Sequence, residues 1–294
     1  MTQHNPGWLV AAPVVFLTLW SGGYVAAKIG LPFTEPMTFL SLRFAIVVVF
    51  MAVLFILIRP PLPKTGTDWM HLAIVGFLLQ SLYFGMCYMA FVSDIAVGTL
   101  ALILSMQPIL VGLIAPRWSG ERVGWKRWCG LLLGLAGAGI VIVSRSEIDP
   151  PNATSLLYAG LALLGITAGA LWEKRFGISH HPVTQNFVGY AAGLIGVLPF
   201  MLLLEDMRID WTPAFVWSLV YLIVGNSLIA VGLLLAMIRA GDVSRVSALF
   251  FLVPPLAAMI AWLLLDEAMP PQAWVGMAIA ATGVYVATRK PGPV

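Results

Sequence analysis

Two stretches of the chain, QPILVGLIAPRWSGE (residues 107–121) and VPPLAAMIAWLLLDE (residues 253–267), follow the same pattern. In each, a proline stands inside an apolar run and a glutamate follows thirteen residues later, at Glu121 and Glu267. The prolines, Pro108 and Pro254, are 146 positions apart (254 − 108 = 146). Proline removes a backbone donor from a helix, so interruptions at equivalent points indicate that the chain contains two copies of one unit.

The same offset relates many residues that are not simply apolar. It relates Gly23 to Gly169, Lys28 to Lys174, Pro36 to Pro182, Thr38 to Thr184, Ser81 to Ser227, Trp128 to Trp274, Gly130 to Gly276 and Gly137 to Gly283. Matches of Leu or Ala mean little in an apolar sequence, but matches of Pro, Glu, Trp and Lys without a gap are hard to obtain by chance. We therefore expect a duplicated chain, divided into residues 1–146 and 147–294.

The composition is that of an integral membrane protein. Of the 294 residues, 60% are hydrophobic and only 10% are charged, and the mean hydropathy is +0.95. A soluble domain carries about 25% charged residues to solvate its surface. The two cysteines, Cys87 and Cys129, lie in apolar runs without metal-type spacing and are expected to behave as small hydrophobic residues.

Ten stretches reach the length of about 20 apolar residues that a spanning helix needs. They are residues 8–29, 36–58, 69–91, 95–116, 125–144, 155–175, 183–204, 213–237, 243–265 and 272–288. Only helices and closed barrels satisfy their backbone groups in lipid, and these runs are too long and continuous for strands. The predicted fold class is an all-α membrane protein with ten transmembrane helices.

The basic residues predict the orientation of these helices. Twelve of them lie in the even-numbered loops and the C-terminal segment: Arg59, Lys64, Arg117, Arg122, Lys126, Arg127, Lys174, Arg175, Arg239, Arg245, Arg289 and Lys290. The odd-numbered loops hold only Lys28, Arg145 and Arg208. Lys and Arg favour cytoplasmic loops, so both termini are expected in the cytoplasm.

The odd number of helices in each unit then determines how the two units are related. Five spans place the start of the second unit on the opposite side of the membrane from the first, so the repeats are inverted. Inverted repeats are typical of secondary transporters, which hold substrate near the membrane midplane between the repeats. The sequence thus predicts transport by alternating access.

These motifs together resemble a known family. WSGGYVAAKIG (residues 20–30), LRF (residues 42–44) and the twice-written proline–glutamate pattern resemble the EamA type of the drug/metabolite transporter superfamily, and within it the YddG-type exporters of aromatic amino acids. The resemblance implies a multi-pass exporter of the bacterial inner membrane. It also implies a central cavity lined by the first, third, fourth, sixth, eighth and ninth helices.

Polar and aromatic residues inside the spans are the candidates for substrate binding. They are Trp20, Tyr24, Gln80, Tyr83, Gln107, Trp172, Asn226 and Phe251. Amides and hydroxyls suit a neutral or zwitterionic solute, and aromatic rings stack on a ring. The alternative is that these amides and hydroxyls join neighbouring helices.

Two prolines and five charged residues have competing interpretations. Pro108 and Pro254 would free the carbonyl oxygens of Leu104 and Phe250 to face a cavity, or would simply kink helices that neighbours support. For gating or coupling the candidates are Arg43, Lys28, Lys174, Glu121 and Glu267. The two glutamates could equally cap helix N-termini, and the lysines could snorkel to headgroups. Arg43 lies about 10 Å into its span by helical rise, where a charge is a functional candidate, although it too could snorkel.

No Asp or Glu lies at the centre of a span, so facilitated export is the simplest expectation. The predicted function is export of amino acids, aromatic ones above all, or of related metabolites. Two alternatives stay open, a proton-coupled exporter of lipophilic cations and a channel or scramblase. No paired nucleophile and base, metal cluster or Walker loop is apparent, so neither an enzyme, a metal nor a cofactor is predicted. The expected partners are a small-molecule substrate and the bilayer, and no nucleic acid is expected to bind. The protein is expected to be a monomer.

Overall fold

The computed structural model describes residues 8–95, 97–118, 120, 123–145, 152–176, 180–240, 243–265 and 270–288. Within these ranges every regular element is a helix, and the nearest approach to a sheet is one isolated antiparallel bridge between Thr34 and Ile209. The first part of the chain forms α1 (Trp8–Gly30), η1 (Leu31–Phe33), α2 (Pro36–Ile58), α3 (Gly66–Gly76), η2 (Phe77–Phe84), α4 (Gly85–Val92), α5 (Val97–Leu104), α6 (Gln107–Trp118) and α7 (Trp125–Arg145). The second part forms α8 (Ala153–Phe176), α9 (Pro182–Leu204), α10 (Pro213–Tyr221), η3 (Leu222–Ala230), α11 (Val231–Ala240), α12 (Val243–Ala248), η4 (Leu249–Leu252), α13 (Val253–Leu265) and α14 (Pro271–Thr288).

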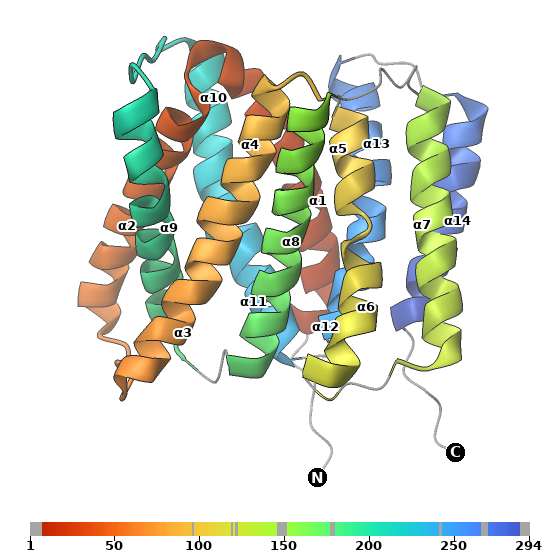
Figure 1. Cartoon of the computed structure of the whole chain (residues 1–294), viewed down its shortest axis with the longest axis horizontal. Coiled ribbons are helices and arrows are strands. Elements are labelled where there is room, and N and C mark those ends of the chain that lie inside the picture. Colours follow the sequence, from red (N-terminus) through yellow and green to blue (C-terminus); the bar gives the residue numbers. More distant parts are fainter. Residues whose placement is uncertain are drawn as a thin grey trace.

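Six helical stretches of the described chain are long and apolar enough to cross a membrane. They are Ala11–Phe33, Pro36–Ile58, Gly66–Val92, Ala153–Phe176, Pro182–Leu204 and Pro213–Ala240. The helices run alongside one another between two ends of the molecule, and α1 begins and α14 ends at the lower end of the view (Figure 1). We call these the lower and the upper end.

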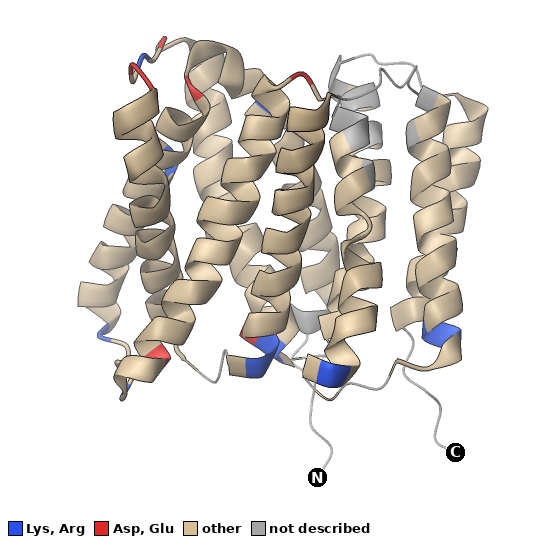
Figure 2. Cartoon of the chain, viewed as in Figure 1, with Lys and Arg blue, Asp and Glu red and all other residues tan. Residues whose placement is uncertain are grey.

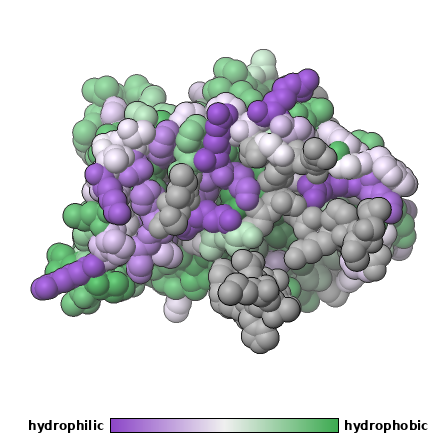
Figure 3. Space-filling view, turned by 90° about the horizontal axis from the view of Figure 1, so that it is seen from below, coloured by the Kyte–Doolittle hydropathy of each residue, from purple (hydrophilic) through white to green (hydrophobic). Residues whose placement is uncertain are grey.

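The surface has the polarity that a bilayer requires. Large hydrophobic side chains such as Leu57, Leu203 and Trp217 are more than 70% exposed on the outer helix faces. Seen from the lower end, hydrophilic residues gather over the middle and hydrophobic residues form much of the rim (Figure 3). Most of the described Lys and Arg lie at the lower end, whereas most of the described Asp and Glu lie at the upper end (Figure 2). The chain is a multi-pass membrane protein.

Local signals explain where the helices begin. Pro36 and Pro182 occupy the first position of α2 and α9, where the missing N–H is tolerated. α3 begins at Gly66, three residues before the predicted Trp69, because Thr65 and Asp68 form a reciprocal capping box. Each apolar run singled out from the sequence corresponds to a helix or to a stack of helical segments in the described chain.

Interruptions of the helices recur at the 146-residue offset. The π-helical segments η2 (Phe77–Phe84) and η3 (Leu222–Ala230) both end at equivalent positions, since 84 + 146 = 230. α6 begins at Gln107 and α13 begins at Val253, again 146 residues apart. Pro108 and Pro254 are therefore the second residues of new helical segments.

One expected consequence of these prolines is not seen. The Phe250 carbonyl, which was expected to be freed by Pro254, accepts a hydrogen bond from the Val253 N–H. The 3₁₀ geometry of η4 shortens the bonding step by one residue, so this carbonyl is satisfied within its own chain segment.

Glycines bring α7 and α14 into close contact. A Cβ atom at Gly130 would collide with the backbone of Gly283 and Ala287, and one at Gly137 would collide with the backbone of Gly276 and Ala280. Small residues at such spacing let membrane helices approach closely. The pairing is reciprocal under the offset, because 130 + 146 = 276 and 137 + 146 = 283.

The packing of α1 and α8 shows the same reciprocity. α1 contacts α10, η3 and α13, whereas α8 contacts α3, η2 and α6. Each of these three partners of α8 lies 146 residues before one of the three named partners of α1. When an element of the first part contacts an element of the second, and their counterparts at the 146-residue offset contact each other in the same way, the contacts have the reciprocity of a two-fold relation.

Candidate functional site

A small cavity lies among α1, α2, η2, α4 and η3. Its walls comprise Trp20, Gly23, Tyr24, Ala27, Arg43, Tyr83, Phe84, Cys87, Tyr88, Phe91, Leu222 and Asn226. The volume of about 20 Å³ is room for about one water molecule. An amino acid would therefore require the surrounding helices to separate.

Aromatic rings form one wall of this cavity. Trp20 stacks on Tyr83 with ring centroids 5.9 Å apart and planes 18° apart, and the hydroxyls of Tyr24 and Tyr83 are 3.1 Å apart. Phe84 lies 5.8 Å and Phe250 5.5 Å from Trp20, both measured between ring centroids. These flat, rigid faces can receive an aromatic ring by stacking.

A charged residue, Arg43, also lines the cavity. Arg43 is fully buried in α2; its Nε donates to the Ser227 hydroxyl at 2.7 Å and its Nη2 to the Asn226 Oδ1 at 2.6 Å. The guanidinium carbon lies 4.6 Å from the centroid of the Phe84 ring, a cation–π distance. Arg43 does not snorkel to the surface, because η3 holds it in the interior.

The π-helical segments position several of these residues. η2 supplies Tyr83 and Phe84, and η3 supplies Leu222 and Asn226. A π-helical segment turns the side chains that follow it relative to those before it, and such segments occur often at functional sites. Here they bring both halves of the chain to one cavity.

The structure brings together half of the predicted binding residues. Trp20, Tyr24, Tyr83 and Asn226 line the cavity. The other four lie elsewhere, and a role in substrate binding stays a prediction for all eight.

Each of these four has a local partner. Gln80 lies against Gly193 of α9, and Gln107 donates from Nε2 to the Ser247 hydroxyl at 3.0 Å. The Phe251 ring fills the space beside Gly134 of α7, while its neighbour Phe250 contacts Trp20.

Trp172 belongs to a cluster at the lower end that joins α3, α6 and α8. Its Nε1 donates to His71 Nδ1 at 3.2 Å, and the His71 ring stacks on Phe176 with centroids 4.4 Å apart. Trp118 of α6 donates to the Leu171 carbonyl at 3.1 Å. This cluster packs side chains over the lower end of α8, away from the cavity.

A buried ion pair lies next to this cluster. Glu173 of α8 is almost completely buried and its Oε1 is 3.1 Å from Arg239 Nε of α11. Arg239 also donates to the His180 carbonyl at 2.9 Å. Glu173 lies near the end of α8, and the structure shows that it is removed from solvent there.

The gating candidates lie at several places. Lys28 is exposed at the end of α1, Lys174 is half-buried near the end of α8, and both prolines are buried. Glu121 and Glu267 lie outside the described residues. Of these candidates, Arg43 is the one that the structure places at the cavity.

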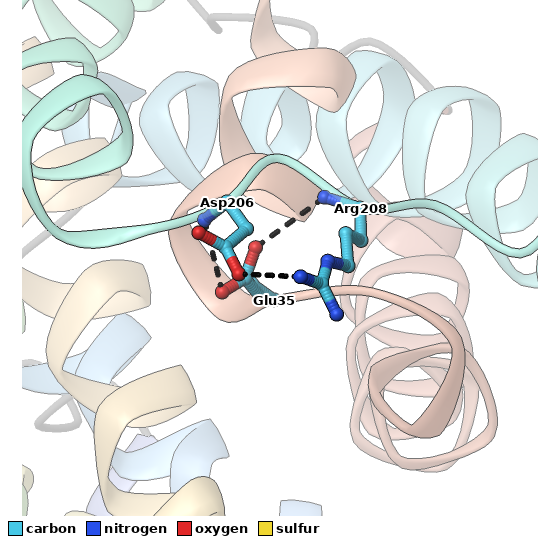
Figure 4. A network of polar contacts seen from close by, with 3 residues as sticks. All are labelled: Glu35, Asp206 and Arg208. Carbon is cyan, nitrogen blue, oxygen red and sulfur yellow. Dashed lines mark hydrogen bonds and ion pairs between the residues drawn. The ribbon is translucent and has the colours of Figure 1, made fainter.

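At the upper end, carboxylates fasten the start of α2 to the segment after α9. Glu205 accepts from the N–H groups of Met37 (2.7 Å) and Thr38 (2.6 Å) and from the Thr38 hydroxyl (2.7 Å). Glu35 accepts in return from the N–H groups of Asp206 and Arg208, which also pair with each other at 3.0 Å (Figure 4).

Several cavity residues were not singled out from the sequence as binding candidates. Phe84, Cys87 and Phe91 are three or four residues apart, as are Gly23, Ala27 and the predicted Trp20 and Tyr24. Residues at this spacing share one helix face. The spacing was therefore a usable signal for these residues. The observed lining differs from the one that the resemblance implied, because α2 contributes Arg43 and no residue of α6, α8 or α13 lines the described cavity.

Comparison with known proteins agrees with this architecture. A crystal structure with 20% sequence identity superposes with a TM-score of 0.79 over 97% of both chains, which shows a shared fold. A "Probable amino-acid metabolite efflux pump" of Escherichia coli (strain K12) is 24% identical over 93% of this chain and 92% of its own. Protein PecM of Dickeya dadantii (strain 3937) is 25% identical over 88% of this chain and 85% of its own.

A "Probable terminal-alkyne amino-acid exporter" of Streptantibioticus cattleyicolor is 26% identical over 66% of this chain and 64% of its own. The profile of the EamA-like transporter family matches twice, at residues 7–143 and at residues 153–289. The chain is a member of the EamA-like transporter family.

Proposed function

We propose that this transporter exports amino acids, with aromatic ones as the preferred substrates, across the bacterial inner membrane. The observation that supports this proposal most is the cavity that stacked aromatic rings and a buried arginine line together. Two of the relatives reported above carry names that refer to amino-acid efflux or export. The closer likeness to YddG-type exporters of aromatic amino acids stays a prediction.

The architecture that we propose is ten passes in two inverted repeats, divided as residues 1–146 and 147–294. Three observations support it: the double match to the family, the reciprocal α7–α14 contacts and the matching partners of α1 and α8. The basic lower end supports cytoplasmic termini (Figure 2).

The transport mechanism that fits is alternating access. The cavity is too small for an amino acid in this conformation, so substrate must enter by separation of helices. Each repeat could then adopt the arrangement that its twin leaves. No carboxylate lines the cavity among the described residues, which favours facilitated diffusion over proton coupling and disfavours a cationic cargo.

Purified protein in liposomes tests this function. Radiolabelled tryptophan, phenylalanine, threonine and tetraphenylphosphonium would be followed with and without a pH gradient. We expect saturable aromatic flux with counterflow, unaffected by the gradient. Flux of the phosphonium cation driven by the gradient would contradict both the substrate and the coupling, and flux without counterflow would indicate a channel.

A pair of tryptophan variants connects the flux with the cavity. We expect Trp20→Leu to lower tryptophan flux about tenfold, the cost of losing about 1.4 kcal/mol, which lies within the range for an aromatic pair. Trp217→Leu is the control, because Trp217 is 74% exposed on α10. Equal losses in both variants would argue against the cavity as the binding site.

A further inference from the structure

Arg43 is a buried charge without a counter-charge. It is 0% exposed, and neither of the ion pairs in the described chain, Arg208–Asp206 and Arg239–Glu173, involves it. A buried, unpaired charge is costly, and in a membrane span it marks a functional site by default. Asn226 and Ser227 satisfy two of its nitrogens but supply no negative charge.

Two polar groups beside the cavity lack hydrogen-bond partners. Nη1 of Arg43 is buried and has no hydrogen-bond acceptor in the described chain. The hydroxyl of Tyr88 is also buried and has no hydrogen-bond partner there. Both residues line the cavity, and the Tyr88 hydroxyl lies beside the Arg43 guanidinium, near hydrogen-bonding reach, without the geometry of a formed hydrogen bond. A buried unsatisfied donor costs free energy, so these two groups point to a ligand that accepts from both.

The other neighbours of Arg43 do not supply that acceptor. Phe84 of η2 and Phe44 of α2 present ring faces to the guanidinium. Tyr190 of α9 is also near Arg43; its hydroxyl donates to the Ser227 carbonyl at 2.9 Å, and its oxygen forms no hydrogen bond with Arg43 Nη1. Every packed element therefore offers the guanidinium a neutral group.

We infer that Arg43 Nη1 and the Tyr88 hydroxyl form the receptor for a carboxylate group of the transported molecule. This inference rests on the proposed function and narrows its substrate to molecules that carry a carboxylate. A guanidinium matches a carboxylate in geometry as well as in charge. The stacked rings of Trp20 and Tyr83 then receive the body of the substrate.

The geometry also explains which molecules would be rejected. A cationic ligand would approach a buried positive charge that no carboxylate of the described chain offsets. A phosphate would bring two negative charges to a single arginine. The cavity's present size, about 20 Å³, admits an oxygen-sized group at Nη1 and requires opening for the rest of the substrate.

Three probes that share one indole ring test the inference by competition. Indole-3-propionate has the carboxylate without the amine, indole-3-propionamide replaces it with a neutral amide, and tryptamine has the amine alone. We expect indole-3-propionate to inhibit tryptophan flux in proteoliposomes at concentrations about 10- to 100-fold below the other two, the range for a charged hydrogen bond. Equal inhibition by all three would overturn the carboxylate receptor while leaving aromatic transport intact.

Binding in detergent gives a second measurement that does not depend on transport. We expect indole-3-propionate to raise the melting temperature of the wild-type protein and to do so less in Tyr88→Phe and in Arg43→Met. Tyr88→Phe removes a hydroxyl that has no hydrogen-bond partner, so its fold should survive even if Arg43→Met does not fold. Tyr221→Phe is the control, because Tyr221 does not line the cavity and its hydroxyl donates to the Leu19 carbonyl.

The combined outcomes separate the two proposals. Stabilisation by indole-3-propionate that needs Tyr88, in a protein that moves no amino acid, would retain the receptor and reject amino-acid export. Stabilisation by chloride as strong as that by indole-3-propionate would overturn a carboxylate receptor, as would full stabilisation of Tyr88→Phe.

Discussion

Glu205 and Asp206 are adjacent in the sequence, yet only the side chain of Glu205 is bonded to another helix. The Glu205 carboxylate accepts three hydrogen bonds from the first turn of α2, at 2.6 to 2.7 Å. Asp206 pairs with Arg208, and the two side chains are 71% and 83% exposed (Figure 4). Carboxylates at a helix N-terminus stabilise the free N–H groups and the helix dipole, whereas exposed pairs contribute little.

These neighbours provide a matched pair of variants. We expect Glu205→Gln to lower the free energy of unfolding by about 1–2 kcal/mol, because the amide has one acceptor oxygen and no charge. Asp206→Asn should change it by less than about 0.5 kcal/mol. Thermal unfolding in detergent checks both, and a larger loss for Asp206→Asn would show that the surface pair matters more than the cap.

The kinds of side chain at the site could be predicted from the sequence better than the direction in which each candidate side chain points. Trp20, Tyr24, Tyr83 and Asn226 were singled out and do line one cavity. Gln80 and Gln107 are chemically similar candidates, but their side chains face α9 and α12. Hydropathy could not separate the two groups, because a helix that is apolar all round gives no sign of which face meets which neighbour.

At the level of elements, the glycines of α7 show that the absence of a Cβ atom can determine how closely two helices pack. A Cβ at Gly137 would lie well inside contact distance of the Ala280 nitrogen and the Gly276 carbonyl oxygen. A Cβ at Gly160 of α8 would meet nothing within 4 Å. The same substitution should therefore have opposite effects at these two positions.

We expect Gly137→Ala to destabilise the protein by about 1–3 kcal/mol, because two backbones must move apart. Gly160→Ala should be neutral or stabilise it by up to about 1 kcal/mol, since alanine favours helix more than glycine does. Melting temperatures of the two variants in the same detergent check the difference. Equal melting temperatures would mean that α7 and α14 can separate at little cost.

Helix positions were predictable because length, hydropathy and proline or glycine boundaries determine them together. The start of α3 was missed by three residues, since Gly66 and Thr67 are not apolar although Thr65 caps the helix. The π-helical segments η2 and η3 were not predicted. A shift from i+4 to i+5 bonding leaves composition unchanged, so the sequence gives no sign of these segments, and the structure relates them only by their common end at the 146-residue offset.

At the scale of the whole molecule, the cavity is not midway between the two ends. It is lined by Ala27 near the end of α1 and by Phe91 near the end of α4, both at the upper end. The cluster around Trp172 and the Glu173–Arg239 pair occupy the lower end. We therefore expect more layers of packed side chains between the cavity and the lower end than between the cavity and the upper end in this conformation.

Cys87 allows this asymmetry to be measured, because it lines the cavity and is buried, while Cys129, the other cysteine of the chain, is exposed on α7. In Cys129→Ser proteoliposomes, we expect a membrane-impermeant thiol reagent to modify Cys87 faster from the upper side than from the lower side. Saturating tryptophan should slow the reaction several-fold, because the substrate would cover the thiol. Alternating access also predicts that Trp172→Ala, which weakens the lower closure, speeds modification from the lower side and slows it from the upper side. Faster modification from both sides at once would instead describe an open channel.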